Sequence, residues 1–360
     1  MFSLFIFIII LSTMILVHEF GHFIVARKLG IRVEQFSLGF GKRLLSCKRN
    51  ATEYSLCLIP MGGFVKLAGD TRDECKGEKH EFLSRKPWER ALVILAGPVL
   101  NYILAFLCFW MVNVLGYPYE TTKVGAIKQG YPAYQAGIQK GDVISSVDGK
   151  QVKYFKELQE SIHNKNTPSV EIEIVRGVNK IKLIVGLRQE VVKNLLGANQ
   201  KISLIGIIPS GEAVLVKHSL GQGFILAGKN LLDLTVLTLK ALGRMFTGAM
   251  SFKENVTGLV GMYFVTSSAL SVGFNEVLKL IAVLSASLAI FNVLPFPVLD
   301  GGHLFFLCLE KLRGRQLNQK IEEQINRVGF GFIIALGVFV FVNDLVNFGI
   351  VHKIVTLLGK

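Results

Sequence analysis

The stretch LVHEFGHFIVARK, residues 16 to 28, places two histidines and a glutamate at the end of an apolar run. Residues 2 to 17 carry no charge, and the apolar character resumes at residues 23 to 26 before Arg27 and Lys28. About 20 such residues suffice for a helix to cross a bilayer. Ionisable side chains at membrane depth are costly and usually functional. We therefore expect a membrane-spanning helix over residues 1–26 with a functional site at one end.

The composition places the whole chain in a membrane. Of its 360 residues, 51% are hydrophobic, and the mean hydropathy is +0.47. Basic residues follow the first apolar run instead of preceding it, which indicates a retained span and not a signal peptide. The net charge of +14 lies mostly in short loops beside apolar segments, which fits membrane orientation better than nucleic-acid binding. The five cysteines show neither zinc nor disulfide spacing.

The apolar segments predict a polytopic α-helical membrane protein with about four transmembrane helices. After the first span we expect further spans over 91–115, 276–312 and 328–360, the last including a C-terminal tail. The loops 27–90 and 313–327 are rich in Lys and Arg, so the positive-inside rule places them in the cytoplasm.

Residues 211–275 are expected to form amphipathic helices outside the cytoplasm or at the interface. The segment 221–249 is nearly long enough to span. Its charged residues, Lys229, Asp233, Lys240 and Arg244, suit a helix that lies on or dips into the interface better than one that crosses it.

Two β-rich regions interrupt the helices. Residues 116–210 alternate short β-like runs with turns, and GYPAYQAGIQKGDVISSVDGKQV, residues 130 to 152, resembles a PDZ domain of the bacterial envelope type. Such a module could bind an extended peptide by strand addition, or serve as a spacer without a ligand. The cytoplasmic piece 33–67 also alternates and predicts a membrane-proximal hairpin or sheet of two or three strands, with Gly62 and Gly63 at a turn or close approach.

The chemistry of the first stretch follows from its spacing. HEFGH, residues 18 to 22, matches H-E-x-x-H. On a helix, His18 and His22 share a face and can bind one zinc ion, while Glu19 reaches a water bound to it. With its pKa lowered by zinc, that water could lose a proton to Glu19 and attack a carbonyl.

Catalytic zinc usually has a third protein ligand. The candidates are Asp300, His303, His80 and acidic residues of 116–210. His18 lies about 24 Å along the first span, near the cytoplasmic boundary of a core about 30 Å thick. The third span reaches the same boundary where Asp300 and His303 lie, which favours these two.

The third span contains FNVLPFPVLDGGH, residues 291 to 303. Its two prolines free backbone carbonyls, which is tolerated only where the unwound chain faces protein or a water-filled cavity. A kinked segment that carries Asn292 and Asp300 and faces the first span is therefore a plausible half-site. Taken alone, LDGG could also be a helix-ending turn with a capping aspartate, which is the less favoured interpretation.

HEFGH, NVLPFPVLDGG and the PDZ-like insert together resemble the site-2 protease family of intramembrane zinc metalloproteases, in its bacterial RseP type with a single PDZ domain. The resemblance covers nearly the whole chain, and AGPVLNYILAF at 96 to 106 is similar to the start of the family's second span. It implies that His18, His22 and Asp300 bind one zinc ion and that Glu19 is the general base.

The resemblance also implies how substrate is held. Asn292, with Pro295 and Pro297 beside it, would contact substrate, and the sheet with Gly62 and Gly63 would guide it. The implied substrates are single-span proteins such as anti-sigma factors, or remnant signal peptides. The implied location is the bacterial inner membrane, with the active site near the cytoplasmic side and the PDZ domain outside the cytoplasm. Some members carry two PDZ modules, whereas this chain has room for one.

Three other functions fit less well. A membrane-tethered zincin with a soluble active site would carry its motif on an amphipathic helix outside the apolar run. A transporter with broken helices predicts interruptions in two halves, and only one proline-broken span is present. A PDZ scaffold with an inactive core is disfavoured by the intact Glu19.

Overall fold

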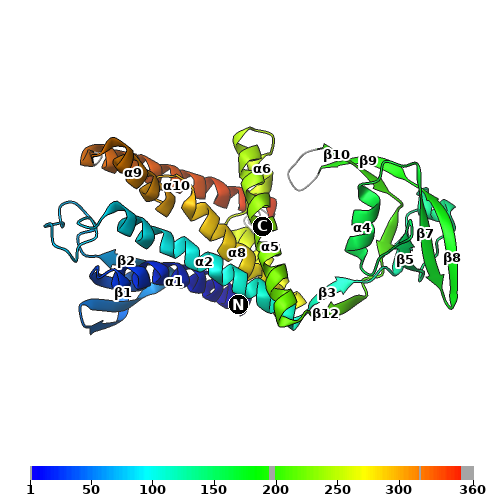
Figure 1. Ribbon diagram of the computed structural model, residues 1–360, viewed down its shortest axis with the longest axis horizontal. Coiled ribbons are helices and arrows are strands. Elements are labelled where there is room, and N and C mark those ends of the chain that lie inside the picture. The colour runs from blue at the N-terminus through cyan, green and yellow to red at the C-terminus, as the bar shows by residue number, and fades with distance from the viewer. Residues whose placement is uncertain (1, 194–198, 316–317, 350–360) are drawn as a thin grey trace, which may run out of the picture. The chain divides into compact units, whose positions relative to one another are not determined.

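The computed structural model describes residues 2–193, 199–315 and 318–349 (Figure 1). Two compact units emerge from the packing. The helical unit comprises the described parts of Met1–Val112, Gly223–Thr238 and Phe252–Lys360. The β-rich unit comprises the described parts of Asn113–Gln222 with Leu239–Ser251.

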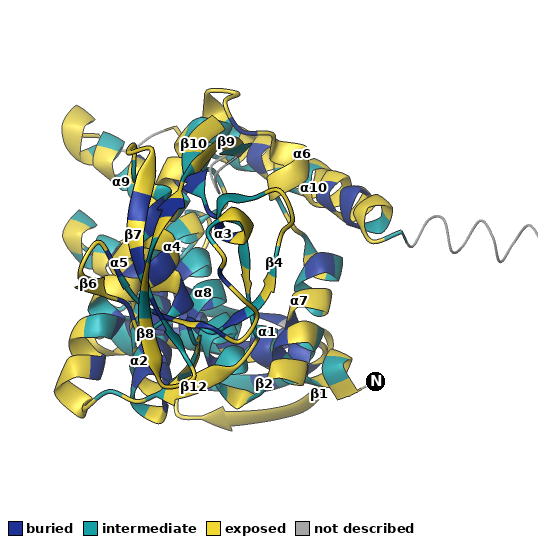
Figure 2. Ribbon diagram, turned by 90° about the vertical axis from the view of Figure 1, so that its right-hand side faces the viewer, coloured by how far each residue is buried: buried dark blue, intermediate teal, exposed yellow. Residues whose placement is uncertain are grey.

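Four helices of the described ranges are long and apolar enough to cross a membrane. They are α1 (Phe2–Lys28), α2 (Pro87–Leu115), α8 (Phe274–Val293) and α10 (Gln319–Asn347). Most of the α10 surface is exposed, as expected for a helix that faces lipid (Figure 2). The prediction of a polytopic helical membrane protein with about four spans is confirmed.

Small residues allow α1, α2 and α8 to pack closely. A Cβ added to Gly21 of α1 would lie 2.2 Å from the carbonyl oxygen of Ala96 in α2. On α8, the buried Ser285 donates its hydroxyl to the carbonyl of Asn101 in α2 at 3.0 Å. These contacts bring three spans together around His18.

A two-stranded sheet, β1 (Val33–Arg49) with β2 (Thr52–Leu67), follows α1. Both strands bend, and residues 35–38 pair with 53–56 on one side and with 63–66 on the other. The bends coincide with left-handed glycines, Gly39 at φ 86° and Gly62 at φ 123°. Residues 63–67 therefore form an edge of the sheet. Phe23, Ala26, Val33, Leu67 and Val93 form a shared core that anchors the sheet on α1 and α2.

The third span, expected as one segment over 276–312 that its prolines kink and unwind, is divided into two helices. It consists of α8, a turn, and a separate helix α9 (Asp300–Arg313). Pro295 and Pro297 lie in the break because proline lacks an N–H and clashes with the preceding helical turn.

Other boundaries also shift. The helix α10 begins at Gln319, nine residues before the expected 328–360, so most of the expected loop 313–327 is helical. The tail residues 350–360 lie outside the described part of the chain. Within 211–275 the structure has β12 (Ala213–Val216), α5 (Leu220–Phe246), α6 (Phe252–Asn255) and α7 (Leu259–Val272). The expectation of amphipathic helices fails for α7, because its 14 residues are apolar or small on every side. Segment 221–249 corresponds to α5, which is not among the four candidate spans.

The β-rich unit has the following elements: β3 (Tyr117–Glu120), β4 (Val124–Ile127), α3 (Pro132–Gln135), β5 (Val143–Val147), β6 (Lys150–Gln151), α4 (Phe155–His163), β7 (Ser169–Arg176), β8 (Asn179–Gly186), β9 (Arg188–Lys193), β10 (Asn199–Leu204) and β11 (Ile207–Pro209). Its main sheet has the order β6-β5-β7-β8, β9 pairs with β10, and β12 pairs with β3. The run 201–210 completes a second pairing, since β11 lies antiparallel to β4. Alternate residues of β7 and one face of α4 are buried in its core (Figure 2).

Candidate active site

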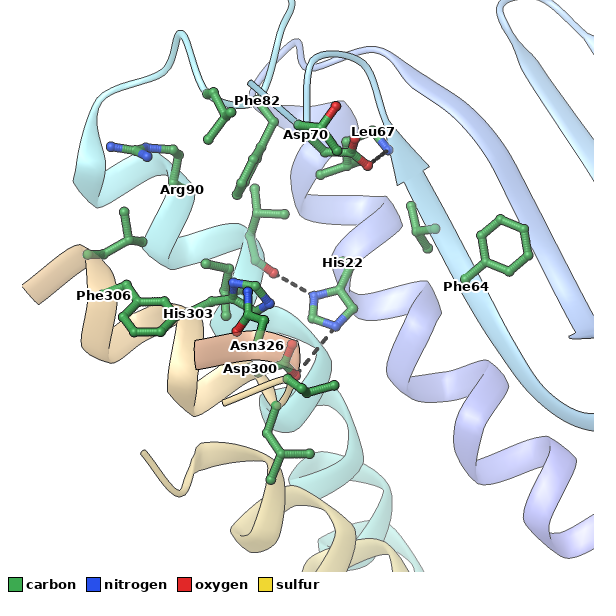
Figure 3. Close-up of a pocket in the computed structure, with 18 of the residues that line it drawn as sticks. His22, Phe64, Leu67, Asp70, Phe82, Arg90, Asp300, His303, Phe306 and Asn326 are labelled. Atoms are coloured by element: carbon green, nitrogen blue, oxygen red, sulfur yellow. Dashed lines mark hydrogen bonds and ion pairs between the residues drawn. The ribbon is translucent and has the colours of Figure 1, made fainter. Parts of the chain in front are cut away.

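His18, His22 and Asp300 meet where α1 passes the first turn of α9. Their three ligand atoms lie within 4.8 Å of one another. His18 Nε2 is 3.0 Å and His22 Nε2 is 3.6 Å from Asp300 Oδ2, and the two Nε2 atoms are 3.2 Å apart. Figure 3 shows His22 and Asp300 pointing toward each other. The structure thus brings together the two histidines of the first motif and the aspartate of the third span.

The cluster fits a zinc ion. Nitrogen and oxygen ligands at about 2.0–2.2 Å from tetrahedral zinc lie roughly 3.3–3.6 Å apart, close to the three spacings found. Asp300 Oδ2 is buried and receives no hydrogen bond from any described residue. A buried carboxylate oxygen without a partner is costly, and a cation would satisfy it.

Two contacts with α2 orient the histidines. His22 Nδ1 lies 2.8 Å from the carbonyl of Val93 and donates to it, which leaves Nε2 with its lone pair toward the cluster. His18 Nδ1 lies 3.4 Å from the amide of Asn101, a fully buried side chain whose Oδ1 has no partner among the described groups. The amide oxygen and nitrogen are interchangeable in shape, and with the oxygen toward His18 the ring would also present Nε2 to a metal. Asn101 was not among the predicted site residues, although an amide inside an apolar span is a signal for function.

Gly97 allows α2 to lie close to the rings of His18 and His22. A Cβ there would lie 2.4 Å from His22 Nε2 and 2.9 Å from His18 Cε1. The role of Gly97 was likewise missed, because periodicity does not reveal how closely two helices approach.

Glu19 faces the edge of the sheet. Its carboxylate accepts a hydrogen bond from the backbone N–H of Val65. A Cβ at Gly63 would lie 2.8 Å from the carbonyl of Ser37 and 3.5 Å from Glu19 Cγ. Gly62 instead lies against the ring of Phe40, where a Cβ would be 2.0 Å from Cε2. Of the two glycines, only Gly63 therefore has Glu19 as a close neighbour.

A cavity of about 1030 Å³ contains the cluster. Asn292 lines it, and so does His303, whose ring is not part of the three-atom cluster. His80 lies elsewhere and pairs with Glu78 at 3.3 Å. Pro295 is exposed and does not line the cavity. Of the third-ligand candidates from the sequence, Asp300 is the one that joins His18 and His22 in a cluster of the described residues.

Comparison with known proteins places the chain in a family. The model of "Peptidase family M50" matches residues 6–336.

The chain belongs to peptidase family M50.

Relatives named provisionally as zinc metalloproteases agree with this placement. Those from Rickettsia conorii and Clostridium perfringens are each 33% identical, covering 95% and 93% of this chain and 98% and 96% of theirs. The relative from Campylobacter jejuni is 31% identical over 94% of this chain and 92% of its own. Two solved PDZ domains of SdrC-like proteins, from Listeria monocytogenes and Listeria innocua, are each 25% identical. They have TM-scores of 0.20 and 0.21 and cover 25% and 26% of this chain and 88% and 97% of theirs.

The predictions of family, enzyme class and cofactor are therefore confirmed. The chain is a multi-pass membrane metallopeptidase of the M50 family, with zinc as its cofactor.

In this M50 peptidase the chain reaches Asp300 through a strained turn. Leu299 N–H donates to the carbonyl of Phe296 at 3.2 Å, so Pro297 and Val298 are the central residues of a β-turn. Val298 has φ 76°, a position that glycine usually takes in turns of this kind. A left-handed β-branched residue costs about 1–3 kcal/mol, and such strain concentrates at functional sites.

The end of the cavity away from Asp300 is polar, with Asp70 and Arg90 on its wall (Figure 3). Arg90 is buried and pairs with Glu310 of α9 at 2.7 Å. Burial raises the pKa of Asp70, although the Leu67 N–H that donates to its carboxylate opposes the shift. The M50 cavity therefore carries a second group of charged side chains besides the candidate metal cluster.

Proposed function

We propose that this M50 peptidase cleaves peptide bonds within the membrane-spanning segments of single-span proteins. The observation that carries the proposal is the position of the cluster within apolar spans. His18 lies 16 residues into α1, about 24 Å along the helix, with apolar chain before it. A peptidase centre at that depth suits a substrate that is itself in the membrane. Anti-sigma-factor-like proteins and remnant signal peptides are the proposed substrates.

In this proposal His18, His22 and Asp300 hold one zinc ion. When bound, zinc polarises a substrate carbonyl and lowers the pKa of water. Glu19 accepts a proton from the attacking water and passes it to the leaving amine. The Val93 carbonyl, and the Asn101 amide when its oxygen faces His18, would hold the two rings in the orientation that leaves Nε2 available.

The sheet edge at residues 63–67 is the proposed guide for substrate. A transmembrane helix hides its carbonyls in hydrogen bonds, so it must unwind before cleavage. Phe64, Val65 and Leu67 line the cavity, and a strand added to this edge would pass Glu19. Asn292, on the same cavity, would donate to the substrate backbone or to the developing oxyanion. Gly62, Pro295 and Pro297 would act by shaping the sheet and the turn.

The proposed location is the bacterial inner membrane, with the metal centre near the cytoplasmic side. The basic residues that end α1 and α9, namely Arg27 with Lys28 and Lys311 with Arg313, support this orientation. The PDZ-like unit would then lie outside the cytoplasm and could bind a peptide by strand addition.

The test is cleavage of tagged single-span helices in liposomes by wild type and by Glu19→Gln. Cleavage within the apolar segment by wild type alone is the expected result, with zinc bound to both proteins. Cleavage restricted to segments outside the bilayer would contradict the proposal, as would equal cleavage by the two proteins.

A further inference from the structure

The turn before Asp300 rests on α10. A Cβ at the buried Gly329 of α10 would lie 2.5 Å from Pro297 Cβ and 3.4 Å from the Pro297 carbonyl oxygen. One helical turn later, the ring of Phe332 packs against that of Phe296, with centroids 5.4 Å apart. A glycine at position 329 is thus what allows the rigid proline ring to lie against the helix.

The β-turn at residues 296–299 sets the direction in which the Asp300 side chain points. Asp300 is the first residue of α9 and follows the strained Val298 by two positions. A Cβ at Gly301 would lie 2.1 Å from the carbonyl oxygen of Leu294, and one at Gly302 would lie 2.3 Å from that of Phe296. Turn and helix start are therefore packed backbone against backbone, so a displaced turn must displace the aspartate.

In the described part of the chain, side chains do not fill the space on every side of the contact between Gly329 and Pro297. An apolar hollow of about 430 Å³ flanks it, lined by Phe296, Pro297, Gln324, Ile325, Val328, Gly329 and Phe332. Because the hollow leaves room for movement on this side, the direct contact with α10 restrains the turn from outside, while the start of α9 packs against it from within.

We infer that Gly329 and Val298 are positioning residues of the metal centre: α10 supports the Phe296–Leu299 turn through Gly329 and so aims Asp300 at His18 and His22. The inference rests on the proposed function only in taking Asp300 as a zinc ligand. It assigns α10, which contributes no ligand, a part in metal binding.

The test compares Gly329→Ala with Gly331→Ala in full-length protein in detergent. A Cβ at Gly331 meets nothing within 4 Å, so this variant controls for adding a methyl group to the same helix. Zinc affinity is measured by chelator competition, and ligand geometry by the absorption spectrum of the cobalt-substituted protein. We expect Gly329→Ala to bind zinc roughly 10-fold more weakly, with a changed cobalt spectrum, because supporting contacts of metal ligands have effects of this size. Gly331→Ala should match wild type.

A rescue separates positioning from general damage. Adding Val298→Gly to Gly329→Ala should restore much of the zinc affinity, because glycine adopts the left-handed turn without support. If Gly329→Ala does not fold, Phe332→Ala decides instead: weaker zinc binding supports the inference and unchanged binding overturns it.

His22→Ala distinguishes the two possible failures. If His22→Ala loses zinc but Gly329→Ala binds it as wild type does, the positioning inference alone is wrong. If His22→Ala binds zinc as tightly as wild type, the proposed metal centre is wrong and the inference falls with it.

Discussion

Gly97 sets the distance between α2 and the two histidines. Replacing it with alanine would place a Cβ 2.4 Å from His22 Nε2, so the rings or the helix must move. We expect Gly97→Ala to lower peptide cleavage at least ~100-fold, since small displacements of reacting groups have such effects. Cleavage of a single-span substrate is the measurement, with Gly337→Ala as control because a Cβ there meets nothing within 4 Å. Equal losses in both variants would contradict this role.

Asn101 acts on His18 from the same helix. Its fully buried amide lies 3.4 Å from His18 Nδ1. We expect Asn101→Leu, which removes the acceptor at similar volume, to weaken zinc binding roughly 10-fold. Asn101→Asp keeps an acceptor oxygen and should retain most of the affinity. Chelator competition measures both, and identical affinities for the leucine variant and wild type would rule out the contact as an orienting one.

At the scale of elements, Asp344 joins two helices. This buried aspartate of α10 accepts hydrogen bonds from the backbone N–H groups of Gly258, at 3.0 Å, and Gly261, at 2.9 Å, at the start of α7. Asp344→Ala would leave these donors without an acceptor in an apolar surrounding. We expect a loss of about 2 kcal/mol or more in the free energy of unfolding. Thermal unfolding in detergent should show a smaller loss for Asp344→Asn and almost none for the exposed Glu323→Ala. If Asp344→Ala leaves the free energy of unfolding unchanged, other contacts hold α7 in place.

The β-rich unit contains the buried carboxylate of Asp142, whose contribution to the free energy of unfolding depends on pH. Arg176 donates two hydrogen bonds of 2.8 Å to Asp142 and lowers the pKa of that carboxyl. Because the pKa is lower in the folded state, the stabilisation is complete above the unfolded pKa of about 3.9 and is lost as pH falls through the folded value.

Asp142→Asn should therefore destabilise the protein at pH 7 by about 1–3 kcal/mol. The difference from wild type should shrink below roughly pH 4, where the wild-type carboxyl is protonated first in the unfolded chain and then, at its lower pKa, in the folded protein. The measurement is thermal unfolding of both proteins at pH 7 and at a pH below roughly 4. Lys182→Met, which removes an exposed pair with Glu171, should cost less than ~0.5 kcal/mol at either pH. A pH-independent effect of Asp142→Asn would mean that the loss does not come from the charge of the carboxylate.

The elements were predictable to different degrees for physical reasons. Unbroken apolar length reveals α1 and α2, and alternation reveals β5, β7 and β8, because these signals lie within one segment. The separate start of α9 depends on the Val298 turn, which rests on the distant helix α10. The early start of α10 coincides with a local cap, in which Asn318 accepts a hydrogen bond from the N–H of Lys320, so the sequence contained a signal for it. Gly97 and Asn101 matter only through partners about 80 residues away, which no local pattern encodes.

At the scale of the whole molecule, the positions of the HEFGH and LDGG motifs in their spans predicted that the two motifs lie close together. His18 and Asp300 are 282 positions apart in the sequence, yet both lie near the same end of their spans, so membrane depth alone places them at one level. Depth could not select among the polar residues at that level. His303 reaches the cavity as well, and only the helical turn that starts at Asp300 directs the aspartate toward the histidines.

The orientation of the chain in the membrane can be tested by labelling cysteines on its two sides. If the basic ends of α1 and α9 face the cytoplasm, the sheet β1–β2 lies inside and the β-rich unit lies outside. Cys47 is exposed on β1, and Val178 is 96% exposed in the turn between β7 and β8. We expect a membrane-impermeant maleimide to label Val178→Cys in intact spheroplasts, and Cys47 only after permeabilisation, in proteins whose other cysteines are replaced. The opposite labelling pattern would invert the topology and place the metal centre near the outer face.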